Sequence, residues 1–216
     1  MKTDLLHPFE NIPYFTLEGF KQAAGMDSPH QVRTLLHRWG QAGHILQLKK
    51  GVYMTRYFYE QHRADYLFSA AVSAILIPQS YLSLEFILQQ HNLLTEVTYP
   101  ITCITTRNTS RIVNPIGTFW YRNIRDNLYR GFAITEYFGI RIAQASVAKA
   151  LFDYLYLRPL PASYRSIKIN LAEELRLNLD ELSTTDHKEF FRIVEESKSR
   201  KMMDILNNFR SNIWHH

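Results

Sequence analysis

The sequence predicts a two-part α+β protein. The first 56 residues have the pattern of two short helices and a hairpin, and the rest has the pattern of helices placed around a run of strand-like segments. The chain has 216 residues, between one and two usual domain lengths, and 46% of them are hydrophobic, which is enough for a core. We therefore predict a first domain at residues 1–56 and a second at residues 57–216.

A capped amphipathic helix is predicted to begin at Pro29. Ser28 is a favoured N-cap residue, and proline suits the first helical position because its missing N–H would be unpaired there. The hydrophobic residues fall at the 3.6-residue spacing of one helix face: Val32, Leu35, Leu36 and Trp39. That face is predicted to lie against a core, and Gly43 is predicted to end the helix.

A helix-turn-helix and a hairpin are predicted around this segment. Thr16 can cap a short helix before it, and the stretch 25–27 is a tight connection between the two helices. After it, the β-prone runs ILQL and VYMT are joined by Lys49, Lys50 and Gly51, and glycine suits a hairpin turn. Helix, turn, helix and basic hairpin in this order predict a winged helix-turn-helix.

Positive charge is concentrated on this first part. The chain has a net charge of +5, and the stretch 28–59 holds five Lys or Arg residues and no Asp or Glu, whereas residues 60–216 hold 18 cations and 16 acids. The outer face of the helix carries groups suited to base edges and phosphates. The predicted DNA contacts are His30, Gln31, Arg33, Thr34, His37 and Arg38 on the helix, with Lys49 and Lys50 on the wing. A merely solvated helix face, or a winged helix that binds protein, remains an alternative.

The second part is predicted to begin with a helix over about 61–76, followed by a second helix capped by Ser83. Four β-branched or aromatic runs then predict a small antiparallel sheet: ITCITTR, TFWYRNI, FAITEYF and IRIAQA. Ser146 is predicted to cap a helix over VAKALFDYLYL, and the remaining chain has helical periodicity. The predicted fold is therefore a winged helix-turn-helix, a mixed domain of helices and sheet, and a helical C-terminal segment.

Several charged residues of the second part are candidates for a partner surface. Lys149 and Asp153, four residues apart, are most simply an exposed helix pair. Six arginines between residues 107 and 141, accompanied by only two acids, form a second candidate anion-contact surface, although a solvated sheet face is an equal alternative. The candidate partner residues are Glu85, His91, Arg107, Arg111, Arg122, Lys149 and Asp153.

The sequence argues against several function classes. Cys103 is the only cysteine, which excludes an intrachain disulfide and a zinc site built from several thiolates. The chain lacks the familiar phosphate-loop, dinucleotide, nucleophile-elbow and zinc-helix motifs, and it contains no D-x-D pair of the kind that a nucleotidyltransferase needs. We therefore expect no enzyme activity, no cofactor and no metal site. No apolar run reaches membrane-spanning length, and a signal peptide is missing, so we expect a cytoplasmic protein without membrane contact.

Successive blocks of the chain resemble those of the AbiEi family, the antitoxin half of type IV toxin–antitoxin and abortive-infection modules. The blocks are YFTLEGF, LKKGVYM, YLSLEFILQQHNLL, ITTRNTSR with the later GTFWYRNI, and IAQASVAKALFDYLYL. The resemblance runs from about Phe15 to Leu157. The chain departs from the family where the stretch 145–147 replaces a common Pro-Glu element, but it retains Lys149 and Asp153.

The resemblance implies a winged-helix domain that represses its own operon and an α/β domain that counteracts a nucleotidyltransferase-like toxin. We therefore expect a DNA-binding transcriptional repressor and antitoxin, active in phage defence, whose partners are double-stranded operator DNA and the cognate toxin. One alternative is a stand-alone winged-helix regulator whose second domain binds a ligand or a protein. Another is a protein-interaction module or an unfamiliar nucleic-acid enzyme.

Overall fold

The computed structural model describes residues 3–94, 100–161 and 168–214, and these residues form an α+β fold with two sheets. The chain divides into two compact units. The first contains Met1–Pro78, Arg111–Phe119 and Glu136–Ile142, and the second contains Gln79–Ser110, Trp120–Thr135 and Ala143–His216.

The first unit extends past residue 56, the predicted end of the first of the domains 1–56 and 57–216, to Pro78, and it also contains two segments from later in the chain. The Asn114 side chain donates to the Leu48 carbonyl at 3.1 Å, and the Tyr137 hydroxyl donates to the Asp65 carboxylate at 2.6 Å. Long-range contacts of this kind leave no mark on local sequence patterns.

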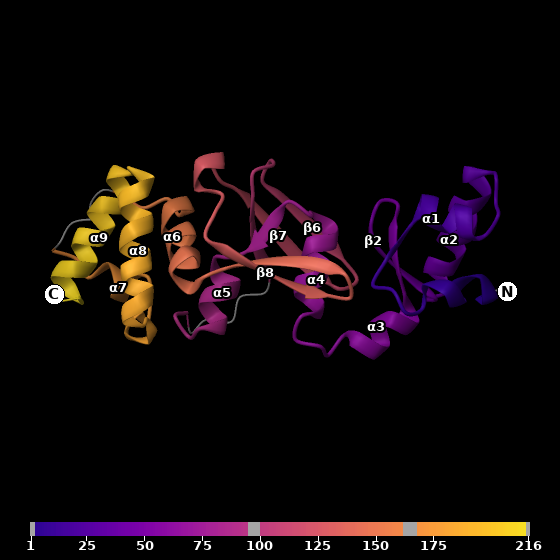
Figure 1. Cartoon of the computed structure of the whole chain (residues 1–216), viewed down its shortest axis with the longest axis horizontal. Helices are drawn as coiled ribbons and strands as arrows, with labels where there is room; N and C mark the ends of the chain where they lie inside the picture. Colours follow the sequence, from indigo (N-terminus) through magenta and orange to yellow (C-terminus); the bar gives the residue numbers. More distant parts are fainter. Residues whose placement is uncertain (1–2, 95–99, 162–167, 215–216) are drawn as a thin grey trace. The chain divides into compact units, whose positions relative to one another are not determined.

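The first unit begins with two helices and a small antiparallel sheet of order β1-β3-β2, drawn in indigo and violet in Figure 1. Its elements up to residue 78 are η1 (Thr3–Phe9), β1 (Phe15–Thr16), α1 (Leu17–Ala23), α2 (Pro29–Gln41), β2 (Ile45–Lys49), β3 (Val52–Thr55), α3 (Arg56–His62) and α4 (Phe68–Leu76). The predicted caps are confirmed: the Thr16 hydroxyl accepts from the Gly19 N–H, and the Ser28 hydroxyl accepts from the Gln31 N–H. Gly51 closes the hairpin with a φ of +77°, a left-handed conformation that favours glycine.

The buried side of α2 forms the core of this region. Val32, Leu36 and Trp39 are buried, as the helical spacing predicts, and Leu35 packs against the same cluster. The Trp39 ring lies edge-on to Phe20 of α1, with ring centroids 5.5 Å apart. This packing fixes which face of α2 points outward.

The single helix predicted over about 61–76 is wrong, because two helices, α3 and α4, occupy that stretch. The chain turns between them at residues 63–67, where the Asp65 carboxylate contacts His62 Nδ1 at 2.9 Å and accepts from Tyr137. Side-chain contacts of Asp65 therefore stabilise the turn between α3 and α4, where the sequence predicts a continuous helix.

The second sheet has six strands in the order β6-β7-β5-β4-β9-β8. The strands are β4 (Ser80–Leu82), β5 (Ile101–Thr105), β6 (Ser110–Asn114), β7 (Gly117–Asn123), β8 (Phe132–Tyr137) and β9 (Ile140–Ala145). The predicted four-stranded antiparallel sheet is wrong in two respects. Two short strands, β4 and β6, were not predicted, and β4 pairs with β9 in parallel, with Leu82 opposite Gln144.

The other elements after residue 78 are α5 (Glu85–Gln90), η2 (Asp126–Leu128), α6 (Val147–Leu157), α7 (Leu171–Glu174), η4 (Leu179–Glu181), α8 (Thr184–Ser197) and α9 (Arg200–Asn212). Ser146 caps α6 as predicted, because its hydroxyl accepts from the Lys149 N–H at 3.1 Å. Within the second unit α6 packs against α8 and α9, which lie side by side in the orange-to-yellow part of Figure 1. None of the helices that the structure describes is long and apolar enough to span a bilayer.

Candidate nucleic-acid interface and buried polar network

The outward face of α2 carries the residues that the sequence predicts for DNA contact. His30, Gln31, Arg33, His37 and Arg38 are all exposed. Thr34 is half-buried, and its hydroxyl donates to the His30 carbonyl at 3.0 Å within the helix. The hydrophobic side of α2 is held in the core, so these polar groups stay on the surface.

A groove of about 500 Å³ lies between α2 and the β2–β3 hairpin. Arg33, His37 and Gln41 line one wall, at successive four-residue steps of the helix, while Gln47 and Tyr53 line the hairpin side. Arg33 and Tyr53 both line the groove, and burial raises the pKa of Tyr53 while the charge of Arg33 offsets part of that rise. The described residues that line this groove include no carboxylate, which suits an anionic ligand.

Arg56 also lines this groove, although the sequence analysis did not assign it to DNA contact. Its Nε donates to the Gly43 carbonyl at 3.2 Å, and its Nη1 lies 3.3 Å from Glu60. These two contacts hold a guanidinium beside α2 that is still almost half exposed. The sequence feature that could have indicated this role is the position of Arg56 directly after a predicted strand, in a stretch that contains no Asp or Glu.

The two lysines of the hairpin differ in environment. Lys50 is exposed at the turn, in keeping with a phosphate contact. Lys49 is half-buried, and its Nζ donates to the last carbonyls of α4, Ile75 at 3.0 Å and Leu76 at 2.6 Å. A cation at a helix C-terminus satisfies carbonyls that have no partner within the helix. The predicted role of Lys49 as a free wing contact is therefore corrected: it fastens the hairpin to α4.

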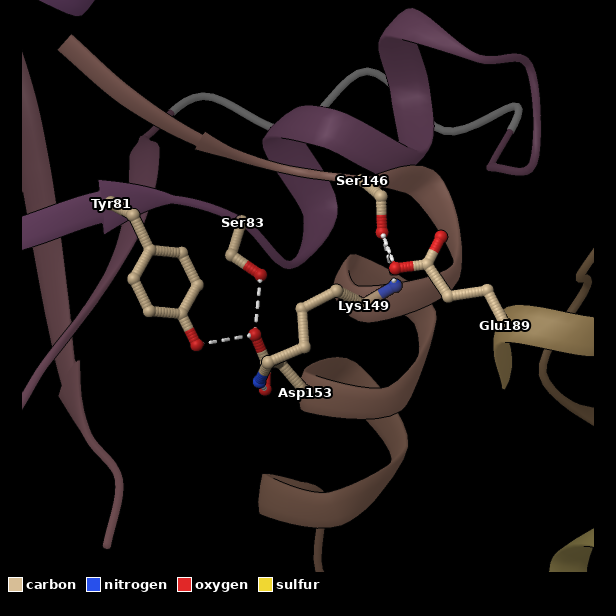
Figure 2. A network of polar contacts seen from close by, with 6 residues as sticks. All are labelled: Tyr81, Ser83, Ser146, Lys149, Asp153 and Glu189. Carbon is tan, nitrogen blue, oxygen red and sulfur yellow. Dashed lines mark hydrogen bonds and ion pairs between the residues drawn. The ribbon is translucent and has the colours of Figure 1, made fainter. Parts of the chain in front are cut away.

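A buried polar network occupies the second unit, at the contact of α6 with β4 (Figure 2). The Asp153 carboxylate pairs with the Lys149 ammonium through one oxygen. Its other oxygen accepts from the Tyr81 hydroxyl at 2.9 Å and from the Ser83 hydroxyl at 2.8 Å. The Lys149 Nζ also lies over the Tyr81 ring, 5.4 Å from its centroid. Each charge of the pair is thus surrounded by groups that stabilise it.

Burial shifts the pKa of three residues of this network, Lys149, Asp153 and Tyr81. It lowers the pKa of Lys149 and raises that of Asp153, and the attraction between the two charges offsets part of each shift. Burial, strengthened by the neighbouring Asp153 charge, also raises the pKa of Tyr81 well above its ordinary value. The tyrosine stays protonated and donates to the carboxylate.

Both interpretations of Lys149 and Asp153, an exposed helix pair and part of a partner surface, are wrong. The two side chains are 1% and 0% exposed. The i, i+4 spacing is correct, but β4 and the residue that follows it cover this face of α6 and supply the hydroxyl groups. The network therefore anchors α6 to the sheet and does not meet solvent.

The aliphatic stem of Lys149 also supports a backbone turn at Gly131. Gly131 has a φ of +80°, and a Cβ placed there would lie 3.2 Å from both Cγ and Cδ of Lys149. At the start of the same helix the Ser146 hydroxyl donates to Glu189 of α8 at 2.9 Å (Figure 2). The sequence analysis did not single out Gly131, Ser146 or Glu189 as a group, because they come from three separate segments.

The remaining candidate partner residues are scattered over several elements. His91, Arg107 and Arg111 are exposed, while Glu85 and Arg122 are half-buried. Two of these arginines have partners in the second unit: Arg107 Nε donates to the Gln79 side chain at 2.9 Å, and Arg122 Nη2 donates to the Leu157 carbonyl at 3.3 Å. These contacts give both guanidiniums a structural role.

Tyr81 was missed by the sequence analysis, and Ser83 was wrongly predicted to cap α5: the N-cap residue is Leu84, and the Ser83 hydroxyl donates to Asp153. Tyr81 and Ser83 stand two residues apart on an extended segment, so their side chains share one face, and this spacing was the available signal.

Within the described residues no cluster of three or more His, Cys, Asp or Glu is arranged to hold a metal ion. No protein-family model matches the chain, and no curated protein matches it in sequence.

Proposed function

We propose that the chain is a DNA-binding transcriptional repressor whose α1–α2 pair and β2–β3 hairpin act as a winged helix-turn-helix. The observation that carries the proposal is the outward face of α2, where Arg33, His37 and Arg38 are exposed beside a groove whose described lining residues include no carboxylate. A helix of this kind fits the major groove of B-DNA, and a basic hairpin beside it can reach the phosphates.

The two kinds of predicted contact have different consequences. Side chains that reach base edges give sequence selectivity, whereas those that reach phosphates give affinity for any duplex. Arg33 and Arg38 project from α2 and are the candidates for base contact, while Lys50 and Arg56 lie on the hairpin side and are the candidates for phosphate contact. Lys49 is not among the candidate DNA contacts, because its ammonium group already donates to carbonyls of α4.

The test is binding of the full chain to the duplex upstream of its own reading frame, compared with a shuffled duplex of equal length. The proposal expects tighter binding to the upstream duplex and a linear fall of log K with log salt concentration. Equal affinity for both duplexes, or binding that does not respond to salt, would refute a sequence-selective regulator.

We further propose that the chain is the antitoxin of a type IV toxin–antitoxin pair. This part of the proposal is supported by the AbiEi-like blocks between Phe15 and Leu157. The test is co-expression of the full chain with the product of the adjacent reading frame, with growth as the readout. Rescue of growth supports the antitoxin, whereas an adjacent product that is harmless, or a toxin that the chain does not counteract, favours a stand-alone regulator.

A further inference from the structure

Strand β8 is an exposed edge of the six-stranded sheet. Among the described strands it has one neighbour, β9. Edge strands present backbone N–H and C=O groups that can pair with another chain, and natural edges are commonly blocked by lysine or proline. The first four residues of β8 contain neither, and Ala133, Ile134 and Thr135 are exposed, with Ile134 at 52%.

A groove of about 480 Å³ within the second unit is lined by four consecutive residues of β8, Phe132–Thr135. Its apolar lining comes mostly from β8, with Ala145 of β9, and its polar lining comes from Thr135, Gln144, Ser146 and Glu189. Phe132 forms part of the wall and is itself held by Tyr81 and Tyr129, with ring centroids 4.8 and 5.3 Å away. Because packed rings support the wall, the groove is a formed feature of this unit.

Glu189 gives the groove its charge. It is the only ionisable residue among the described residues that line it. One carboxylate oxygen accepts from the Ser146 hydroxyl, which in turn accepts from the Lys149 N–H and is fixed by it. A positioned carboxylate in the lining of a largely apolar groove is complementary to a lysine or arginine side chain.

We propose that this groove binds an extended segment of a partner protein, which adds to the β8 edge through its backbone and places a lysine or arginine against Glu189. Strand addition of this kind takes its affinity from main-chain hydrogen bonds and its selectivity from pockets for alternate side chains. A second copy paired through β8 fits less well, because Phe132–Tyr137 contains no lysine or arginine to meet Glu189. The inference does not depend on DNA binding or on antitoxin activity.

The probes are ten-residue peptides selected from a random displayed library against the immobilised full chain and then synthesised. The proposal expects them to contain a lysine or arginine within a β-branched context. Glu189→Gln keeps an oxygen that can accept from Ser146 but removes the charge, so it should weaken peptide binding about tenfold, the loss of one charge-assisted contact. Glu195→Gln, an exposed carboxylate on the same helix, is the matched control and should bind as the unmodified chain does.

Two further measurements make the result decisive. Bound peptide should slow hydrogen exchange of the amides of residues 132–135, and N-methylation of alternate peptide amides should abolish binding. The inference is overturned if no peptide is selected, if the selected peptides show no preference for a basic residue, or if Glu189→Gln binds them equally well. It is also overturned if sedimentation shows a dimer that Ile134→Asp dissociates, since the occupant would then be a second copy.

Discussion

Two helices of this chain hold charged side chains in opposite environments. On α2, Arg33 and Arg38 are exposed, and no ion pair joins them to a carboxylate in the described part of the chain. On α6, Lys149 and Asp153 are buried and paired with each other. A cation without an internal partner is available to an external anion, whereas a buried pair is already satisfied by the fold. The comparison therefore favours α2 as the binding surface of the proposed function and gives the charged pair of α6 a structural role.

The largest expected effect is on the buried pair. Lys149→Met leaves the Asp153 carboxylate buried without its counter-charge, which should lower the free energy of unfolding by about 3–5 kcal/mol. Urea unfolding followed by circular dichroism measures this loss. The double variant Lys149→Met with Asp153→Asn carries neither charge and should recover at least half of it. A loss under about 1 kcal/mol in the single variant would show that water reaches the pair.

The next effect concerns binding and should leave stability unchanged. Arg33→Ala or Arg38→Ala should cost about 1–3 kcal/mol in binding to the upstream duplex if that arginine contacts a base, and much less on shuffled DNA. Fluorescence anisotropy with both duplexes gives the difference. Lys188→Ala, which removes an exposed cation from α8, is the control. Equal losses on both duplexes would identify the arginine as a phosphate contact.

The neighbouring hairpin lysines provide a finer comparison. Lys50→Ala should reduce the slope of log K against log salt concentration by about one unit, with no effect on unfolding. Lys49→Ala should leave the slope unchanged but lower the free energy of unfolding by about 1–2 kcal/mol, because the α4 carbonyls lose a charged donor. If the two variants exchanged these effects, the contact between Lys49 and α4 would be absent in solution.

The smallest expected effect is a pH dependence of the free energy of unfolding that arises from Asp65. This carboxylate is less exposed than the arginines of α2 and less buried than the pair on α6. The hydrogen bond from Tyr137, followed by that with His62, lowers the pKa of Asp65 below its ordinary value of 3.8. The stabilisation is therefore present above pH 3.8 and is lost as the pH falls through the lower folded-state pKa. Tyr137→Phe removes the larger cause, so the difference in unfolding free energy between this variant and the unmodified chain should shrink in acid.

Urea unfolding at a series of pH values between about 3 and 7 measures this difference. Tyr66→Phe alters a tyrosine that is 88% exposed in the same segment, and it should show no such trend. A difference that is constant with pH, or that grows in acid, would contradict the assigned direction.

Local chemistry predicted the elements whose ends are determined by one or two residues. Ser28 and Pro29 gave the start of α2, Gly51 gave the hairpin, and Ser146 gave the start of α6. The outward polar face of α2 followed from the same periodicity, because a helix with one hydrophobic stripe has only one way to face a core.

Features that depend on distant partners were not predictable in this way. Lys149 and Asp153 have the same spacing whether the pair is exposed or buried, and the difference is made by a hydroxyl 72 positions away, on Tyr81. The parallel pairing of β4 with β9 likewise joins segments about 60 residues apart. Lys49 was misassigned for the same reason, since its partners belong to α4.

The close approach of Gly131 to the stem of Lys149 ties two features together. A side chain at residue 131 would place its Cβ 3.2 Å from the stem of Lys149, which would have to shift slightly, and it would also strain a backbone with a φ of +80°. The same glycine forms part of the groove beside β8. A substitution of Gly131 therefore changes the groove and displaces the lysine of the buried ion pair at the same time, so at this position the surface is coupled to the interior.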